Sequence, residues 1–175
     1  MKERLIKSKI TFRNRIYRLT WFFVNLIFFR FTPNFLHRWR CLILRLMGAK
    51  IGKGVAVYPN VKIWSPKQLL IEDGGCLGDH SICYNQALVH IGKEAIVSQY
   101  AYLCTAGHDI RSQEFDLQIA PIKICEKAWV GTSAFVGPGV IMKERSVAAA
   151  NSSVIKDVES DIVVGGNPAE AIATR

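Results

Sequence analysis

Hydrophobic residues recur along residues 51–158 with a period of six. Fifteen hexads begin at residues 51, 57, 63, 71, 77, 83, 91, 97, 103, 124, 130, 136, 142, 148 and 154, and twelve of these first positions are Ile, Leu or Val. The fifth position is Val, Gly, Ala or Ser in fourteen hexads, with Lys67 as the exception. This period fits neither a helix nor a strand that alternates every second residue. It predicts a three-sided prism in which each hexad supplies one short strand.

Three hexads make one coil of eighteen residues, and the spacing of the coil starts tests this prediction. The starts Ile51, Ile71, Ile91, Ile124 and Met142 are separated by 20, 20, 33 and 18 residues. The insertions are therefore 2, 2, 15 and 0 residues, and each falls between the third hexad of one coil and the first hexad of the next. We expect about five coils, spanning residues 48–160, whose extra residues emerge at one corner. The largest insertion predicts a protruding loop over residues 109–123 with His108 at its base.

Residues 1–47 lack the six-residue period and predict two helices. The apolar run of residues 19–29 is bounded by arginines and contains Asn25. At ~1.5 Å per residue it covers about half of the ~30 Å hydrocarbon core of a bilayer, so it is too short for an ordinary transmembrane helix. Residues 32–34, Thr-Pro-Asn, break the first helix, and a second amphipathic stretch ends at Gly48, which is placed as a helix C-cap.

Charge separates the same two segments. Residues 1–50 carry twelve Lys or Arg and one acidic residue, whereas residues 51–175 carry eleven basic and thirteen acidic residues. Aromatic rings and arginines suit the lipid headgroup region, so we expect residues 1–47 to associate with a membrane surface. Packing over the apolar end of the prism is the alternative, and the two are compatible. Nucleic acid is disfavoured as a partner, because the cations are interleaved with aliphatic residues and Phe.

The cysteines indicate a reducing compartment. There are five, an odd number without a disulfide-like framework, and no cleavable signal peptide is recognisable. Cys83 begins a hexad, so it should face the core as a small apolar side chain. We therefore expect a cytoplasmic protein. Together with the expected membrane association of residues 1–47, this predicts a location at the inner face of the cytoplasmic membrane.

Several motifs resemble those of the hexapeptide-repeat acyltransferases, whose fold is a left-handed parallel β-helix. They are GAKIG (48–52), VKIWSP (61–66), CYN (83–85), SQYAYLCTAGHD (98–109), AWVG (128–131), VGPGV (136–140) and GGNPA (165–169). Within that superfamily they are similar to the colanic acid biosynthesis acetyltransferases, a group related to galactoside, maltose and nodulation acetyltransferases. The resemblance implies an all-β core, a C-terminal tail with a short helix over residues 161–175, and a homotrimer with active sites between subunits.

The resemblance also implies transfer of an acetyl group from acetyl-CoA to a hydroxyl of a sugar or lipid-linked glycan, as in exopolysaccharide biosynthesis. His108 matches the catalytic histidine of the family, as general base for direct transfer without an acyl-enzyme. A neutral imidazole can take the proton of an attacking hydroxyl near pH 7. A loop carboxylate (Asp109, Glu114 or Asp116) or a backbone carbonyl could orient its ring.

Acceptor and donor contacts follow from the same resemblance. Tyr84, Asn85 and Asp109 are expected at the acceptor, although Asn85 could instead serve a corner turn. The expected donor contacts are Trp129, Gly131, Thr132, Ala150 and Lys156. A backbone N–H near Gly131 or Thr132 would stabilise the negative charge that develops on the thioester oxygen. Where relatives carry Lys or Arg after the Pro-Ala of the tail, this chain has Glu170, which leaves Lys156 and Arg175 for the phosphates of CoA.

Other classes of function fit less well. A zinc site of the γ-carbonic anhydrase type needs three converging imidazoles, and His80, His90 and His108 lack its close paired spacing, so no metal is expected. No N-terminal glycine-rich phosphate loop indicates a sugar nucleotidyltransferase. A membrane-attached scaffold without catalysis, or an acyltransferase with a non-sugar acceptor, stays open. The insertion rooted at His108 favours an enzyme, because a scaffold has no need of it.

Overall fold

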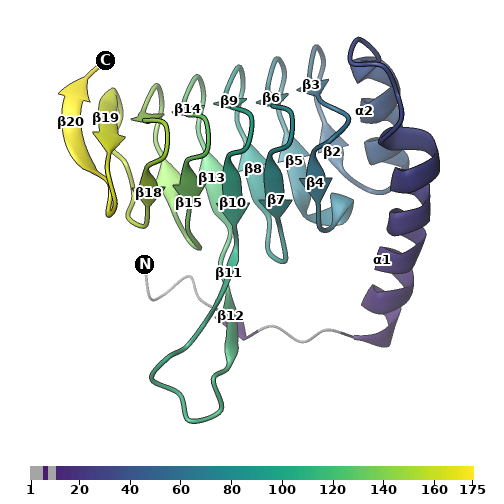
Figure 1. Cartoon of the computed structure of the whole chain (residues 1–175), viewed down its shortest axis with the longest axis horizontal. Coiled ribbons are helices and arrows are strands. Elements are labelled where there is room, and N and C mark those ends of the chain that lie inside the picture. Colours follow the sequence, from purple (N-terminus) through teal and green to yellow (C-terminus); the bar gives the residue numbers. More distant parts are fainter. Residues whose placement is uncertain (1–5, 8–10) are drawn as a thin grey trace.

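A computed structural model describes residues 6–7 and 11–175 as one solenoid with helices at its N-terminal end (Figure 1). Short strands follow one another around three sides, and equivalent strands of successive coils pair in parallel. The fold is a left-handed parallel β-helix of about six turns. The sequence predicted about five, because the period fades after residue 158, whereas Val158 bridges to Met142 and starts a further turn.

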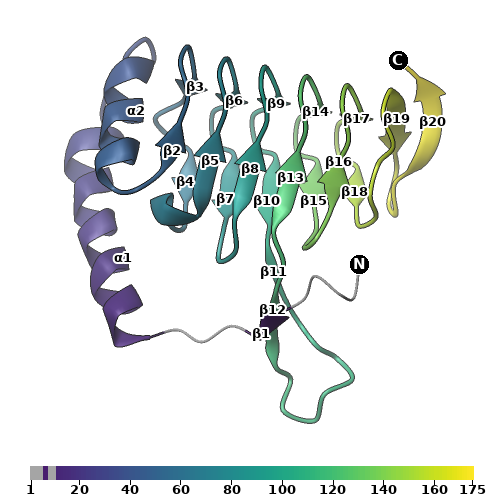
Figure 2. The ribbon, with the colours of Figure 1, turned by 180° about the vertical axis from the view of Figure 1, so that it is seen from behind.

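Each of the first five coils contributes one strand to each of three faces, which are seen from opposite sides in Figures 1 and 2, and the last turn contributes β19 (Ile162–Gly165). The first face contains β2 (Lys50–Ile51), β5 (Leu69–Ile71), β8 (Val89–Ile91), β13 (Ile122–Ile124) and β16 (Ile141–Met142). The second contains β3 (Ala56–Val57), β6 (Cys76–Leu77), β9 (Ile96–Val97), β14 (Trp129–Val130), β17 (Val147–Ala148) and β19 (Ile162–Gly165). The third contains β4 (Lys62–Ile63), β7 (Ile82–Tyr84), β10 (Tyr102–Cys104), β15 (Phe135–Val136) and β18 (Ser153–Val154). We call the corner after each face the first, second or third corner of its coil.

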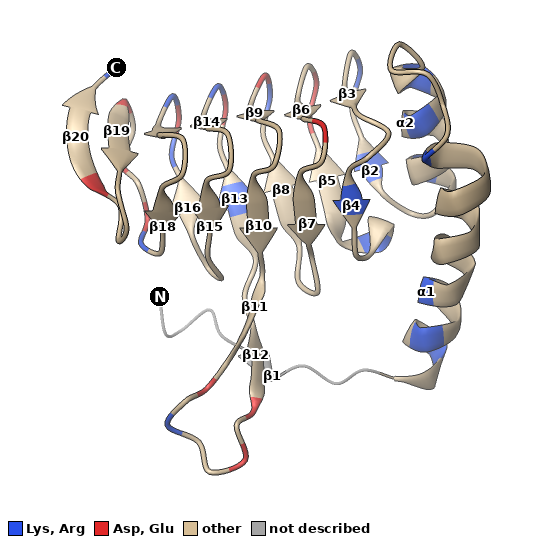
Figure 3. Ribbon diagram, in the orientation of Figure 1, with Lys and Arg blue, Asp and Glu red and all other residues tan. Residues whose placement is uncertain are grey.

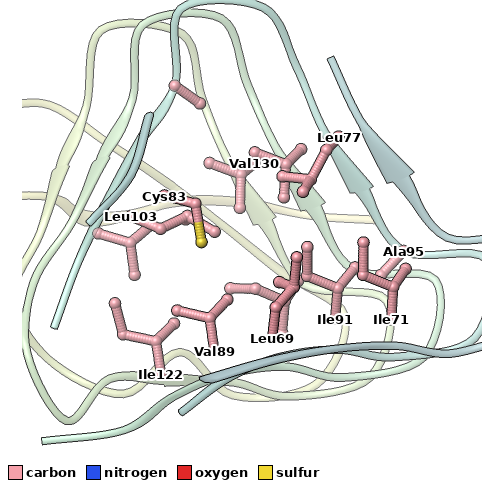
Figure 4. Close-up of a cluster of buried hydrophobic side chains, with 14 of the residues drawn as sticks. Leu69, Ile71, Leu77, Cys83, Val89, Ile91, Ala95, Leu103, Ile122 and Val130 are labelled. Atoms are coloured by element: carbon pink, nitrogen blue, oxygen red, sulfur yellow. The ribbon is translucent and has the colours of Figure 1, made fainter. Parts of the chain in front are cut away.

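The predicted register is confirmed throughout the stack. The predicted coil starts are paired neighbours in the first face, in the order Ile51, Ile71, Ile91, Ile124 and Met142. Fourteen of the fifteen hexad first positions are buried, and Ile51 in the terminal coil is half-buried. Figure 4 shows some of them, among them Ile71, Leu77 and Leu103, with other buried side chains inside the prism. Cys83 is among them with 0% exposure, as expected, and burial raises the pKa of its thiol.

The insertions all emerge at the third corner, as predicted. Coil one carries a 3-10 helix (Pro66–Gln68) there, coil two carries residues 85–88, and coil three carries a β-hairpin of β11 (Ala106–His108) and β12 (Leu117–Ile119). The strand β1 (Ile6–Lys7) pairs with β12. Three hexads have a fifth residue that is not buried, and all three residues lie at this corner: Lys67, Ala87 and Gly107. The hairpin spans residues 106–119, so the predicted bounds of 109–123 are wrong: His108 is already outside the coil, and Ile122 is back in register with Val89.

Two helices cover the open end of coil one. Helix α1 (Phe12–Val24) continues into a π-helix (Asn25–Phe29), and α2 (His37–Leu46) follows the predicted break. Trp21, Phe29 and Leu44 are buried in the same core cluster as the coils. Gly48 has φ +93° and its N–H donates to the Arg45 carbonyl, which confirms the predicted C-cap. No helix of residues 11–175 is long and apolar enough to cross a membrane.

Arg40 joins these helices to the first coil. Its side chain is fully buried, and its guanidinium donates to the carbonyls of Val57, Pro33 and Asn34 and to the Thr32 hydroxyl. One buried cation therefore holds the turn between the helices against β3.

The C-terminus closes with a hairpin, so the predicted short helix is wrong. β19 pairs in parallel with β17 and in antiparallel fashion with β20 (Glu170–Thr174). Ala and Glu favour a helix locally, but this preference is weak. The unpaired edge of β19 offers backbone partners to the tail, and that pairing outweighs the local preference.

Candidate active site

The hairpin of β11 and β12 extends away from the prism (Figure 1), and His108 is the last residue of β11. β11 and β12 place His108 opposite Leu117. At the base, the N–H and the hydroxyl of the fully buried Thr105 both donate to the Tyr84 carbonyl, and the Thr105 carbonyl accepts from the Ala120 N–H. The histidine therefore stands at the end of a strand that is anchored to coil two.

The ring of His108 is oriented by the far side of the hairpin turn. Its Nδ1 lies 2.7 Å from the Phe115 carbonyl oxygen, and the two rings stack with centroids 4.6 Å apart and planes 8° from parallel. Since a carbonyl only accepts, Nδ1 carries the proton in this contact, and in the neutral ring Nε2 is then the unprotonated nitrogen. Nε2 can then accept a proton from a hydroxyl, as a general base must. Of the orienting groups considered above, a backbone carbonyl makes the contact.

The carboxylates of the loop bond within the turn itself. The Asp109 carboxylate accepts from the Arg111 N–H and from the Gln118 amide, and the Asp116 carboxylate accepts from the Ser112 hydroxyl. These bonds hold the turn that presents the orienting carbonyl. Asp109 lies next to the histidine in the chain, but a contact between its carboxylate and an acceptor stays a prediction.

Asn85 lies on coil two, and its side chain bonds the backbone at the third corner of coil one. Its side chain has 0% exposure. Its Oδ1 accepts from the Ser65 N–H at 3.0 Å, and its Nδ2 donates to the carbonyls of Ser65 (2.7 Å) and Gln68 (2.9 Å). In the single chain Asn85 therefore has the corner role that was the alternative to an acceptor contact.

Tyr84 lies on the outer surface of the third face. Its neighbours there, Trp64 and Arg18, were not selected from the sequence. Its ring packs edge-on against Trp64 with centroids 4.8 Å apart, and Gln86 donates to its hydroxyl. The guanidinium carbon of Arg18, on α1, lies 3.3 Å from the centroid of the Trp64 ring. An outward Trp in a hexad of the first coil was the available signal, since nothing in the prism requires a large aromatic there.

The residues expected to bind the donor lie on coils four and five. Trp129 on the second face is 46% exposed, and its indole N–H donates to the Ser98 hydroxyl at 2.8 Å. Lys156 is exposed at the third corner of coil five. His108 projects from the third corner of coil three, so the third face lies between it and Trp129. One chain alone does not bring these groups together.

The second corner of coil four is closely packed. The Gly131 N–H donates to the Ala148 carbonyl at 2.8 Å, so it is not free to stabilise an oxyanion. A Cβ at residue 131 would lie 2.7 Å from that carbonyl oxygen and 2.8 Å from the Ala150 nitrogen, so the approach of coil five requires glycine. The Thr132 N–H remains the candidate oxyanion donor of the two.

Arg175, which was considered above as a ligand of the CoA phosphates, bonds backbone carbonyls of its own chain. The Arg175 guanidinium donates to the carbonyls of Lys127 and Arg145. Among residues 6–7 and 11–175, no group of three or more His, Cys, Asp and Glu side chains is arranged to hold a metal ion.

Known proteins share this sequence and fold. Over 155 residues, 89% of this chain and 85% of the relative, the sequence is 43% identical to "Putative colanic acid biosynthesis acetyltransferase WcaF" of Escherichia coli K12. A hexapeptide-repeat-containing acetyltransferase of Vibrio cholerae, complexed with acetyl-coenzyme A, has a TM-score of 0.85 at 23% identity, covering 95% of this chain and 91% of that one. A maltose O-acetyltransferase from Clostridium difficile 630 has a TM-score of 0.82 at 22% identity, covering 91% and 87%. No protein-family model matches. The identity and coverage of the first relative show that the chain belongs to the hexapeptide-repeat acetyltransferases, in the family of the colanic acid biosynthesis enzymes.

Proposed function

We propose that this protein transfers an acetyl group from acetyl-CoA to a sugar hydroxyl in the biosynthesis of an exopolysaccharide or another cell-surface glycan. The oriented His108 carries the proposal, and the name of the Escherichia coli relative supports the class of acceptor. Nε2 takes the hydroxyl proton as the oxygen attacks the thioester carbonyl. The C–S bond then breaks, and the proton passes to the sulfur of the leaving CoA.

Replacing the histidine tests this role. Loss of a general base lowers turnover by typically 10²–10⁴-fold, so we expect a fall of that order in kcat for His108→Ala. His108 is exposed, so the unfolding transition and CoA binding should be unchanged. His90→Ala, at a surface histidine paired with Glu72, is the matched control and should keep wild-type turnover. Wild-type kcat in His108→Ala would overturn the general-base role.

We propose that Trp129, Thr132, Ala150 and Lys156 hold the donor along coils four and five, with the Thr132 N–H facing the thioester oxygen. Because the third face separates Trp129 from His108 within a chain, we infer a homotrimer in which each site combines two subunits. Light scattering should give the trimeric mass. Refolding a mixture of His108→Ala and Trp129→Ala chains should restore activity that neither variant has alone, and its absence would contradict a shared site.

We also propose that residues 1–47 place the enzyme at the cytoplasmic face of a membrane, near a lipid-linked acceptor. One stripe of α1 and the π-helix exposes large apolar side chains, each 51–76% exposed: Phe12, Ile16, Leu19, Phe23 and Ile27. Exposed arginines flank it, among them Arg13, Arg15 and Arg30. An apolar stripe with flanking cations suits the interface of an anionic bilayer.

Flotation with vesicles tests this location. The protein should float with vesicles of phosphatidylglycerol and phosphatidylcholine, and less with phosphatidylcholine alone. Replacing Leu19, Phe23 and Ile27 with Ser should abolish flotation without loss of turnover on a soluble acceptor. Equal flotation of that variant would contradict the proposal.

A further inference from the structure

A cavity of about 390 Å³ lies between α1 and the outer surface of the third face, at coils one and two. Helix α1 and the segment after it contribute Arg18, Trp21 and Arg30, and the coils contribute Lys62, Trp64 and Tyr84. The proposed roles of His108 and of the donor residues do not use this cavity.

The cavity is basic. Three of its lining residues are Lys or Arg, and none is Asp or Glu. The surrounding chain has the same bias, because residues 11–71 contain eleven Lys or Arg and no acidic residue. Figure 3 shows the resulting cluster of cations on the helices and the first coil, with acidic residues further along the solenoid. Three cations and no carboxylate among the lining residues favour an anion, although the Asp79 carboxylate accepts from the lining Asn60. Phosphate groups bind such cations through charge-assisted hydrogen bonds.

The walls of the cavity are aromatic and fixed in place. The rings of Trp64 and Tyr84 pack edge-on, and Arg18 stacks over Trp64. The Trp21 indole N–H donates to the Ile63 carbonyl at 2.7 Å, which holds that ring against coil one. Apolar aromatic walls with a few polar groups are typical of sites for small organic ligands. The ligand should therefore combine a phosphate with a less polar group.

The cavity and the hairpin lie on the same side of the molecule. Tyr84 pairs with Cys104 on the adjacent strand. Cys104 precedes His108 by four residues, and four residues span at most about 14 Å. A molecule that extends from the cavity along the third face therefore points toward the base of the hairpin.

We propose that this cavity binds the phosphate of an acceptor sugar that is attached to a diphosphate carrier. The proposal rests on the proposed acetyl transfer and specifies its acceptor as a phosphate-linked sugar rather than a free one. The carrier is either a nucleoside diphosphate or a lipid diphosphate. Both present the same charged group to Arg18, Arg30 and Lys62, and they differ in the group attached beyond it.

Calorimetric titration of the full-length protein tests the proposal. Saturating CoA is present throughout, so that the donor site is filled and cannot take up the probes. We expect GDP and farnesyl diphosphate to bind, and the tighter of the two to identify the source of the carrier. The double variant Arg30→Gln/Lys62→Gln should raise the Kd at least about tenfold, because each lost cation removes a charge-assisted contact. Both side chains are exposed, so the variant should fold. Lys50→Gln, on the first face of the same coil, is the matched control and should leave the Kd unchanged.

Absence of binding by both probes, or an equal Kd in the double variant, would overturn the proposal. A neighbouring subunit that filled the cavity would give the first of these results. Binding is measured without turnover, so the two proposals fail separately. Acetylation of an uncharged glycoside without diphosphate binding would reject the phosphate site and leave acetyl transfer standing. Diphosphate binding that depends on Arg30 and Lys62, without acetylation of any sugar, would support the site and reject the proposed reaction.

Discussion

The second and third corners of the solenoid are built by opposite means. At the second corner no coil carries inserted residues, and at Gly131 the backbones of successive coils are too close for a side chain. At the third corner coils one to three carry extra residues, and buried polar side chains, Asn85 and Thr105, bond the backbone of the neighbouring coil. Successive coils thus approach closely at Gly131 of the second corner, whereas the third corner uses polar side chains and leaves room for the hairpin with the candidate catalytic base.

The largest effect is expected at the third corner, from Asn85→Ala. The change leaves the Ser65 N–H and the Gln68 carbonyl without their Asn85 partner, whereas the Ser65 carbonyl keeps the bond from the Gln68 N–H. At 1–3 kcal/mol for each unsatisfied group, we expect a loss of about 2–5 kcal/mol in the free energy of unfolding. Urea titration at fixed protein concentration measures it.

The exposed Gln99, at the second corner of coil three, supplies the control. Gln99→Ala should change the unfolding free energy by no more than about 0.5 kcal/mol. If Asn85→Ala kept full stability and only raised the KM for the acceptor, the corner role would be wrong and an acceptor contact would explain the residue.

A smaller effect is expected from Gly131→Ala at the second corner. The new methyl group would lie 2.7 and 2.8 Å from backbone atoms of the next coil, which cannot move independently. We expect a loss of about 2 kcal/mol, as for other overpacked sites. Gly137→Ala, at the third corner of the same coil, meets its nearest atom at 3.4 Å and should cost less than about 1 kcal/mol. Equal costs in thermal unfolding would remove the distinction between the corners.

The smallest effect is expected from Thr105→Val. The hydroxyl donates to the Tyr84 carbonyl and accepts from the Ala87 N–H, so the change leaves that N–H without its acceptor. The Tyr84 carbonyl keeps the bond from the Thr105 N–H, and we expect a loss of about 1 kcal/mol. Thr105→Ser retains the hydroxyl and should recover most of this loss. A valine variant as stable as the wild type would show that the hydroxyl is dispensable.

The six-residue period was sufficient to predict the register of all coils and the corner of every insertion. The pattern is local, because each hexad has its own inward-facing first residue and small fifth residue. The position of a hexad in its coil can therefore be predicted without knowledge of distant residues. The burial of Cys83 and the cap at Gly48 were predictable for the same reason, because each depends on residues close in the chain.

The missed features depend on distant partners. Arg40 is one of many arginines in the leader, and its burial depends on acceptors on the inter-helix turn and on β3. The tail forms β20 only because β19 has a free edge. The Phe115 carbonyl could not be selected in advance, because every residue of the loop has one and only the paired hairpin decides which faces His108. Local periodicity predicts the scaffold, and non-local pairing decides the details of the site.

The antiparallel strand β20 has a consequence for self-assembly. A stack of parallel coils is open at its last coil, where a further chain could add in the same register and extend the molecule into a fibre. β20 runs against β19 and so presents no parallel register to a following coil. The other end is covered by helices, so neither end of this solenoid presents a coil in parallel register to a further chain.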